Sequence, residues 1–73
     1  MEIGSKVTIE TVSPMSYQLY QHYKKKVPII VCPCTYKNKT VALTVEDIIG
    51  KALILSFGDF MTICLEEDCK EIN

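Results

Sequence analysis

Arginine is absent from the chain, and histidine occurs only once, at position 22. Arginine is the side chain that most often recognises DNA bases, so its absence disfavours sequence-specific DNA binding. The longest apolar runs, at 27–34 and 52–55, are far shorter than the ~18–20 residues that a membrane-spanning helix needs. The N-terminus also lacks the basic start and apolar stretch of a secretion signal. We therefore expect a soluble cytoplasmic protein without a membrane partner.

Sequence patterns of enzymes are missing as well. The three glycines stand apart and form no phosphate-binding loop, and no catalytic signature surrounds His22 or the cysteines. A domain of 73 residues has little room for a substrate pocket of the usual ~300–1,000 Å³. We expect a non-enzymatic protein that binds no small-molecule substrate.

The chain does have enough apolar sequence to fold. Hydrophobic residues make up 48% of the sequence and charged residues 23%, a balance typical of one globular domain over residues 1–73. The net charge of −1 creates no general field for nucleic acids or anionic membranes. The charges are nevertheless segregated, because a basic stretch (Lys24–Lys26, Lys37 and Lys39) contrasts with acidic residues at 66–71. Such segregation favours oriented binding of a partner.

The N-terminal third predicts a strand followed by a helix. Apolar and polar residues alternate over Lys6–Val12, which is typical of a half-buried strand. Ser13 and Pro14 are favoured at the N-cap and the first position of a helix, and the residue before Pro28 avoids helical angles. We therefore predict a helix over residues 14–26. Its apolar stripe consists of Met15, Leu19, Tyr20 and Tyr23.

The middle of the chain predicts two further strands and a short helix. Apolar, β-branched residues at Pro28–Cys34 predict a strand that is buried on both faces. Residues 36–40 predict a tight turn in which Asn38 takes a left-handed angle, and the chain returns as a strand over Thr40–Leu43. Thr44–Asp47 resembles a capping box and predicts the short helix. The apolar side and the end of that helix are Val45, Ile48, Ile49 and Gly50.

The last third predicts a β-hairpin. Gly58 and Asp59 form a two-residue loop of the kind that joins hairpin strands, here Lys51–Phe57 and Phe60–Glu66. This register pairs, on one face, Phe57 with Phe60, Leu55 with Thr62 and Leu53 with Cys64, and on the other face Ile54 with Ile63 and Ala52 with Leu65. Both faces are largely apolar, so one is expected to pack on the helices. The other face needs a cover, either the rest of the sheet or a partner chain.

Together these elements predict a small α+β domain in the order β-α-β-β-α-β-β. Its sheet is expected to be mostly antiparallel, with one longer and one short helix. The polar segment at 67–73 is expected to be a frayed acidic tail.

Four cysteines form two close pairs, Cys32 with Cys34 and Cys64 with Cys69. Four thiolates suffice for a tetrahedral structural zinc site, and residues two apart on a strand project to the same face. Neither pair has the C-x2-C spacing that is typical of a zinc knuckle. Three alternatives therefore remain open: a zinc site of all four cysteines, a disulfide, or unlinked thiols that pack as small apolar residues.

An uncovered apolar hairpin face and unpaired strand edges favour a function in protein binding. We expect a small regulatory or inhibitory protein that forms a homodimer through its hairpin. The composition suits an accessory protein of a phage, an archaeal virus or a plasmid. The candidate partner-binding residues are Phe57, Phe60, Ile54, Ile63 and Leu65.

The alternative is a nucleic-acid-associated module, which a structural zinc ion would stabilise. Tyrosines interleaved with lysines can stack on bases and contact phosphates. The predicted surface combines the helix at 14–26 with the turn at 36–40. Its candidate residues are Tyr17, Lys24, Lys25, Lys26, Tyr36, Lys37 and Lys39.

Overall fold

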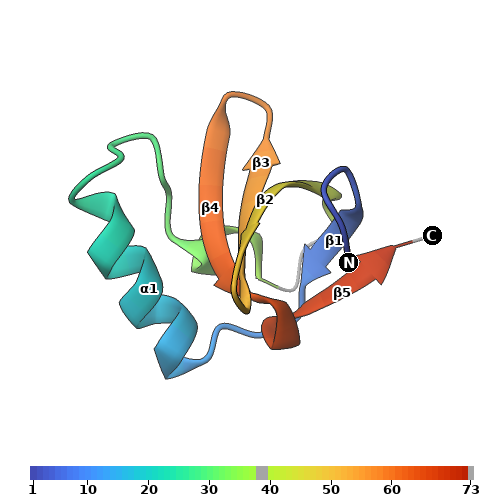
Figure 1. Ribbon diagram of the computed structural model, residues 1–73, viewed down its shortest axis with the longest axis horizontal. Coiled ribbons are helices and arrows are strands. Elements are labelled where there is room, and N and C mark those ends of the chain that lie inside the picture. The colour runs from blue at the N-terminus through green and yellow to red at the C-terminus, as the bar shows by residue number, and fades with distance from the viewer. Residues whose placement is uncertain (38–39, 73) are drawn as a thin grey trace.

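One helix and a five-stranded antiparallel sheet form the computed structural model, which describes residues 1–37 and 40–72 (Figure 1). The helix is α1 (Pro14–Lys24), and the strands are β1 (Lys6–Ile9), β2 (Leu43–Ile49), β3 (Ala52–Phe57), β4 (Phe60–Leu65) and β5 (Cys69–Ile72). Two 3₁₀ turns, η1 (Pro33–Tyr36) and η2 (Glu66–Asp68), complete the chain. The predicted small α+β domain with a mostly antiparallel sheet is confirmed.

Among the described residues, no helix is both long enough and apolar enough to cross a membrane.

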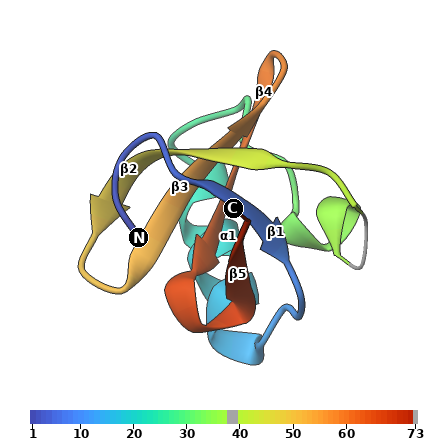
Figure 2. The same cartoon turned by 90° about the vertical axis from the view of Figure 1, so that its right-hand side faces the viewer.

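The sheet has the strand order β4-β3-β2-β1-β5, so β4 and β5 are its edges. The central strand β2 is bent by an irregularity between Val45 and Asp47. Before this point β2 pairs with both β1 and β3, and after it β2 pairs with β3 alone. A bulge of this kind increases the local twist of a sheet. In Figure 2, β2 accordingly runs across the molecule and joins the β1–β5 half to the β3–β4 half.

Two apolar clusters fill the space around the bent sheet. The larger cluster consists of Val7, Ile9, Tyr36, Leu43, Val45, Leu53, Leu55 and Cys64. The smaller one consists of Tyr20, Ile30, Ala52 and Ile63, and it lies between α1 and the neighbouring strand β4 (Figure 1). One face of the β3–β4 hairpin therefore contributes to the larger cluster, and the opposite face is covered by the helix.

The predicted hairpin is confirmed in every pair of its register. Phe57 lies opposite Phe60, and the remaining pairs follow the predicted alternation from Ser56 and Met61 to Ala52 and Leu65. Gly58 has φ 60°, a left-handed angle that glycine adopts at little cost in a two-residue turn. This local turn chemistry is sufficient to fix the register of the two strands.

The predicted short helix at 44–49 is wrong, because these residues belong to β2. Val45, Ile48 and Ile49 are β-branched, and such side chains favour an extended backbone when neighbouring strands supply pairing. Gly50 ends the strand with φ 61° and begins the turn to β3. Pairing with β3 thus overrides the capping-box pattern at Thr44–Asp47.

The predicted buried strand at Pro28–Cys34 is also wrong. Only Ile30 pairs, in an isolated parallel bridge with Met61, and Pro33 already begins η1. Proline cannot donate a hydrogen bond to a neighbouring strand, which limits pairing at both ends of this segment. The strand predicted over Thr40–Leu43 begins only at Leu43, and Asn38 of the predicted turn lies outside the described residues.

The prediction of a frayed acidic tail at 67–73 is wrong for residues 67–72. Residues 69–72 form β5, which pairs with β1 along its whole length, from Ile9 opposite Cys69 to Lys6 opposite Ile72. The polarity of this segment gave no sign of backbone pairing with a strand about 60 residues earlier. The ends of the first strand and of the helix also differ from the predictions at 6–12 and 14–26, since β1 ends at Ile9 and α1 at Lys24.

A buried carboxylate fastens α1 to the sheet. Asp68 at the end of η2 is only 5% exposed. It accepts hydrogen bonds from Thr11 Oγ1 (2.9 Å), from the backbone nitrogen and Oγ of Ser13 (3.0 and 2.7 Å), and from Ser16 Oγ (2.5 Å). Ser13 is the N-cap of α1, so the negative charge lies at the positive end of the helix.

Ser16 extends this network into the hairpin. Its hydroxyl is fully buried and accepts a hydrogen bond from the backbone nitrogen of Leu65 at 2.9 Å. The same oxygen lies 3.5 Å from the sulfur of Cys64. The first turn of α1 is therefore bonded both to the end of β4 and to η2. We call Thr11, Ser13, Ser16 and Asp68 the Asp68 network.

The Asp68 network also sets the protonation of its carboxylate. Burial by itself raises the pKa of Asp68, but the hydrogen bonds from Ser16, Ser13 and Thr11 outweigh it and hold the pKa below the usual 3.8. A carboxyl with a lowered pKa in the folded state contributes stability above the pKa of the unfolded chain. That contribution is lost as the pH falls through the folded-state pKa.

The Asp68→Ala substitution is expected to lower the free energy of unfolding by about 3 kcal/mol, because the buried Ser16 hydroxyl and three partly buried donors lose a charged acceptor. Urea denaturation at pH 7 measures this loss. The matched control is Glu67→Ala, which removes an exposed carboxylate from the same 3₁₀ turn and is expected to change stability by less than ~0.5 kcal/mol. Equal effects of the two substitutions would contradict this role of Asp68.

Acid is expected to destabilise the wild-type protein more than the Asp68→Ala variant. Between pH 7 and about pH 2, the wild type loses the Asp68 contribution in the lowest part of the range, below the ordinary pKa, and the variant has none to lose. Urea midpoints measured across this range for both proteins test the point. Parallel curves with a constant offset would refute it.

Candidate functional site

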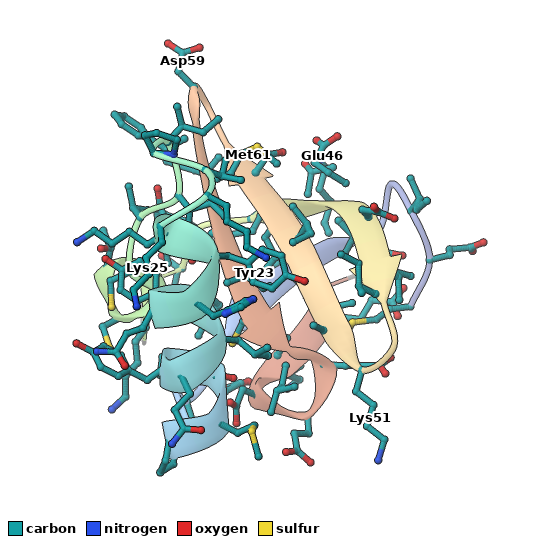
Figure 3. All side chains as sticks on the ribbon, turned by 60° about the vertical axis from the view of Figure 1, so that its left-hand side comes forward. Tyr23, Lys25, Glu46, Lys51, Asp59 and Met61 are labelled. Atoms are coloured by element: carbon teal, nitrogen blue, oxygen red, sulfur yellow. The ribbon has the colours of Figure 1, made fainter. Side chains whose placement is uncertain are left out.

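Two exposed phenylalanine side chains lie at the tip of the β3–β4 hairpin. Phe57 and Phe60 flank the turn and remain 42% and 55% exposed, although they lie opposite one another in the sheet. Asp59 lies at the outer end of the turn, as Figure 3 shows. Because the hairpin is paired along both strands, these two rings are held on a rigid support.

A third apolar side chain joins the tip from a different part of the chain. Residues 30–31 run parallel to β4, where Ile30 pairs with Met61 and the nitrogen of Val31 donates to the Met61 carbonyl at 2.8 Å. Ile29 lies in the turn directly before this bridge, one residue from Ile30 as Phe60 is one residue from Met61, and it is 51% exposed. We refer to Ile29, Phe57 and Phe60 as the apolar tip.

Ile29 is not among the site residues predicted from the sequence, because the apolar pattern at 28–34 predicts a buried strand. The signal was present in Pro28 and Pro33, which interrupt the apolar run and disfavour a fully paired central strand.

The apolar tip is the part of the hairpin that the fold leaves uncovered. The expectation that a whole hairpin face needs a partner is wrong for Ile63 and Leu65, which are buried within the chain. Tyr20 of α1 belongs to the same cluster as Ile63, and Ile54 is half-buried against this cluster. Of the five candidate partner-binding residues, only Phe57 and Phe60 are therefore largely exposed.

Tyr36 supports the apolar tip from the inside. Its ring contacts Phe57 edge-on, with 5.5 Å between the ring centres and an angle of 62° between the planes. Such an arrangement is favourable for aromatic pairs. Because Tyr36 is buried, it does not offer the stacking face that the nucleic-acid hypothesis assigned to it.

Lysines are concentrated in the segment that leads to and follows residue 29. Residues 11–45 contain five lysines and neither aspartate nor glutamate, so all nine acidic residues lie elsewhere in the chain. Lys24–Lys26 are exposed at the end of α1, and the chain that follows lies at the same end of the molecule as the hairpin turn (Figure 1). Lys37 is exposed directly after Tyr36, whereas Lys39 lies outside the described residues. In the part of the chain that the structure describes, no lysine forms a salt bridge.

The exposed side of α1 carries a shallow surface hollow of about 400 Å³. It is lined by Tyr17, Tyr20, Gln21, Lys24 and Lys25. Tyr17 is 43% exposed, and its ring centre lies 5.8 Å from that of the buried Tyr20. The Lys24 ammonium lies 5.6 Å from the Tyr20 ring, within range of a cation–π interaction. His22 is exposed on the same helix, and its ring contacts Tyr23 edge-on.

The structure keeps the four cysteines as free thiols. Within residues 1–37 and 40–72, no group of three or more histidine, cysteine, aspartate or glutamate side chains lies close enough to hold a metal ion. The two sequence pairs remain separate, since Cys34 interacts with Cys32, and Cys64 interacts with Cys69. The structure therefore does not assemble Cys32, Cys34, Cys64 and Cys69 into one set of ligands.

Comparisons with protein-family models, with curated proteins and with solved structures found no significant match to this chain.

Stability measurements can separate the covered hairpin face from the apolar tip. Ile63→Ala is expected to lower the free energy of unfolding by about 2–4 kcal/mol, because it leaves a cavity under α1. Phe60→Ala removes a larger side chain, yet it is expected to cost less than ~1 kcal/mol because that ring is largely exposed. Chemical denaturation of both variants provides the comparison, and a larger loss for Phe60→Ala would contradict the placement of the tip.

Proposed function

We propose that this protein is a non-enzymatic binding module that inserts its apolar tip into an apolar pocket of a larger partner protein. The observation that carries the proposal is the exposure of Ile29, Phe57 and Phe60 at one end of an otherwise covered hairpin. Aromatic side chains on rigid supports are typical anchors of protein interfaces, because they bury much area and lose little conformational entropy.

The size of the apolar tip favours a concave partner over a second copy of the chain. A buried aromatic side chain contributes ~150–250 Å², so three half-exposed side chains offer on the order of 300 Å². A stable interface buries about 800 Å² on each partner. The tip therefore supplies an anchor, and the surrounding polar surface must supply the rest of the contact. A homodimer formed through Ile63 and Leu65 would require α1 to leave the sheet.

We expect the exposed lysines of this chain to face acidic side chains at the rim of the partner's pocket. Lys24–Lys26 are exposed at the end of α1, and Lys37 follows Tyr36, whose ring contacts Phe57. Acidic side chains around a pocket would complement these charges, accelerate association and fix the orientation of docking. A chain without a catalytic set that occupies such a pocket acts on its partner by blocking or stabilising it. This mode of action is that of a regulatory or inhibitory protein, including the accessory proteins of viruses and plasmids.

Site-specific photo-crosslinking in lysate of the source cells tests the proposed docking mode. A photoreactive phenylalanine analogue at position 60 is expected to form one discrete adduct larger than a dimer of this chain. The same analogue at position 67, in the exposed part of η2, serves as the control and is expected to form none. The adduct is expected to disappear with Phe57→Ala and Ile29→Ala, and to survive nuclease treatment.

Three results of this experiment would overturn the proposal: the absence of an adduct, an equal adduct from position 67, or an adduct of twice the chain's mass. The last result would identify a second copy as the partner. Circular dichroism of each variant establishes that the fold is retained.

The hollow on α1 favours single-stranded nucleic acid as a second candidate ligand. Tyr17 offers an exposed ring, and Lys24 and Lys25 line the same hollow. Exposed aromatic rings next to cations bind single strands by stacking and by phosphate contacts. The surface is separate from the apolar tip, so the two functions can be distinguished by substitution.

Fluorescence anisotropy with a labelled oligothymidylate or oligouridylate tests this second candidate. Binding is expected to weaken steeply with salt, and Lys24→Glu with Lys25→Glu is expected to abolish it, because phosphate contacts release counterions. Phe60→Ala is expected to leave the affinity unchanged. Absence of binding at low salt, or binding that resists the lysine substitutions, would remove this candidate.

A further inference from the structure

Two cysteines from opposite edges of the sheet point into the same core. Cys64 of β4 lies opposite Leu53, and Cys69 of β5 lies opposite Ile9. Leu53, Ile9 and Cys64 all belong to the larger apolar cluster, and Cys69 packs against it. The bend of the sheet therefore brings the two thiols together, although β4 and β5 are the two outermost strands.

The two thiols interact directly. The Cys69 thiol donates a hydrogen bond to the Cys64 sulfur, which lowers the pKa of Cys64 and raises that of Cys69. The Cys64 sulfur also lies 3.5 Å from Ser16 Oγ of the Asp68 network. Cys64 has no exposed surface, whereas Cys69 is partly exposed and accessible to a small reagent.

We propose that Cys64 and Cys69 form a thiol–disulfide exchange site, whose oxidised form links β4 covalently to β5. The co-reactant is a small disulfide such as oxidised glutathione. This site is independent of the proposed binding function, since neither cysteine belongs to the apolar tip.

The reaction proceeds through two exchanges. The pair first loses one proton to solvent, and the Cys69 sulfur then attacks one sulfur of the oxidised glutathione while its own proton passes to the neighbouring Cys64 sulfur, so that a mixed disulfide forms and one glutathione thiolate leaves. The Cys64 thiol loses its proton and attacks the Cys69 sulfur, which forms the Cys64–Cys69 bond and releases the second glutathione. Two cysteine thiols are thereby oxidised by two electrons, and one glutathione disulfide is reduced to two thiols.

The disulfide would close the segment that contains η2. Only four residues separate the two cysteines, and the last of them is Asp68. The link would prevent β5 from leaving β1 without also displacing β4, and it would hold Asp68 close to Ser16. Oxidation is therefore expected to stabilise the attachment of both β5 and α1.

The test uses a Cys32→Ser, Cys34→Ser variant, which retains only the proposed pair. After the folded variant is incubated with oxidised glutathione, its mass is expected to fall by two hydrogens. Cleavage after Glu66 or Glu67 is expected to leave the Cys64 and Cys69 peptides joined. Its melting temperature is expected to rise by roughly 5–15 °C and to return on reduction with dithiothreitol.

The control adds Cys69→Ser to the same background and is expected to show neither the link nor the rise in melting temperature. Two thiols that stay free in the folded state, oxidation only in denaturant, a covalent dimer, or an equal rise in the control would each overturn the proposal. If the double variant does not fold, fragment masses of the oxidised wild type decide between a Cys64–Cys69 link and a Cys32–Cys34 link.

Discussion

The buried carboxylate of Asp68 is the constraint on which the arrangement of helix and sheet depends. It accepts hydrogen bonds from the linker before α1, from the N-cap of the helix and from its first turn. Through Ser16 it is also connected to the end of β4. A buried charged acceptor with four donors, of which the Ser16 hydroxyl is fully buried, is worth more than a surface ion pair, because its loss leaves these donors without their charged partner. α1 consequently remains on the hairpin and keeps Ile63 covered.

This attachment determines which apolar surface the molecule presents. With one hairpin face in the larger cluster and the other beneath α1, Phe57 and Phe60 are the large apolar side chains of the hairpin that stay largely exposed. The acid-free segment of residues 11–45 supplies the exposed Lys24–Lys26 and Lys37. An apolar anchor with a basic surround thus arises from two features: the length of the hairpin beyond the helix and the segregation of charge along the chain. Both features support the proposed docking into an acidic-rimmed pocket.

The sequence allowed the local parts of this structure to be predicted, but not the parts that depend on distant residues. Gly58 and Asp59 determine the hairpin register, and Ser13 and Pro14 determine the start of α1, so both were predicted correctly. The strand β5 and the C-terminal half of β2 depend on pairing with other strands, which no local pattern reveals. The polar character of 66–73 concealed Asp68, because its four donors come from residues more than 50 positions away.

The residues of the candidate site also fall into those that a local pattern predicts and those whose burial depends on distant residues. Phe57 and Phe60 follow from the turn, whereas the burial of Ile63, Leu65 and Tyr36 depends on α1 and η1. Native-state amide hydrogen exchange at Leu65 tests the central claim most directly, because its amide is bonded to Ser16 of the docked helix. We predict that it exchanges as slowly as the amides of Leu53 and Leu55, through unfolding of the whole domain. Exchange that is much faster than that of these two amides would show that α1 detaches on its own, and would contradict the account.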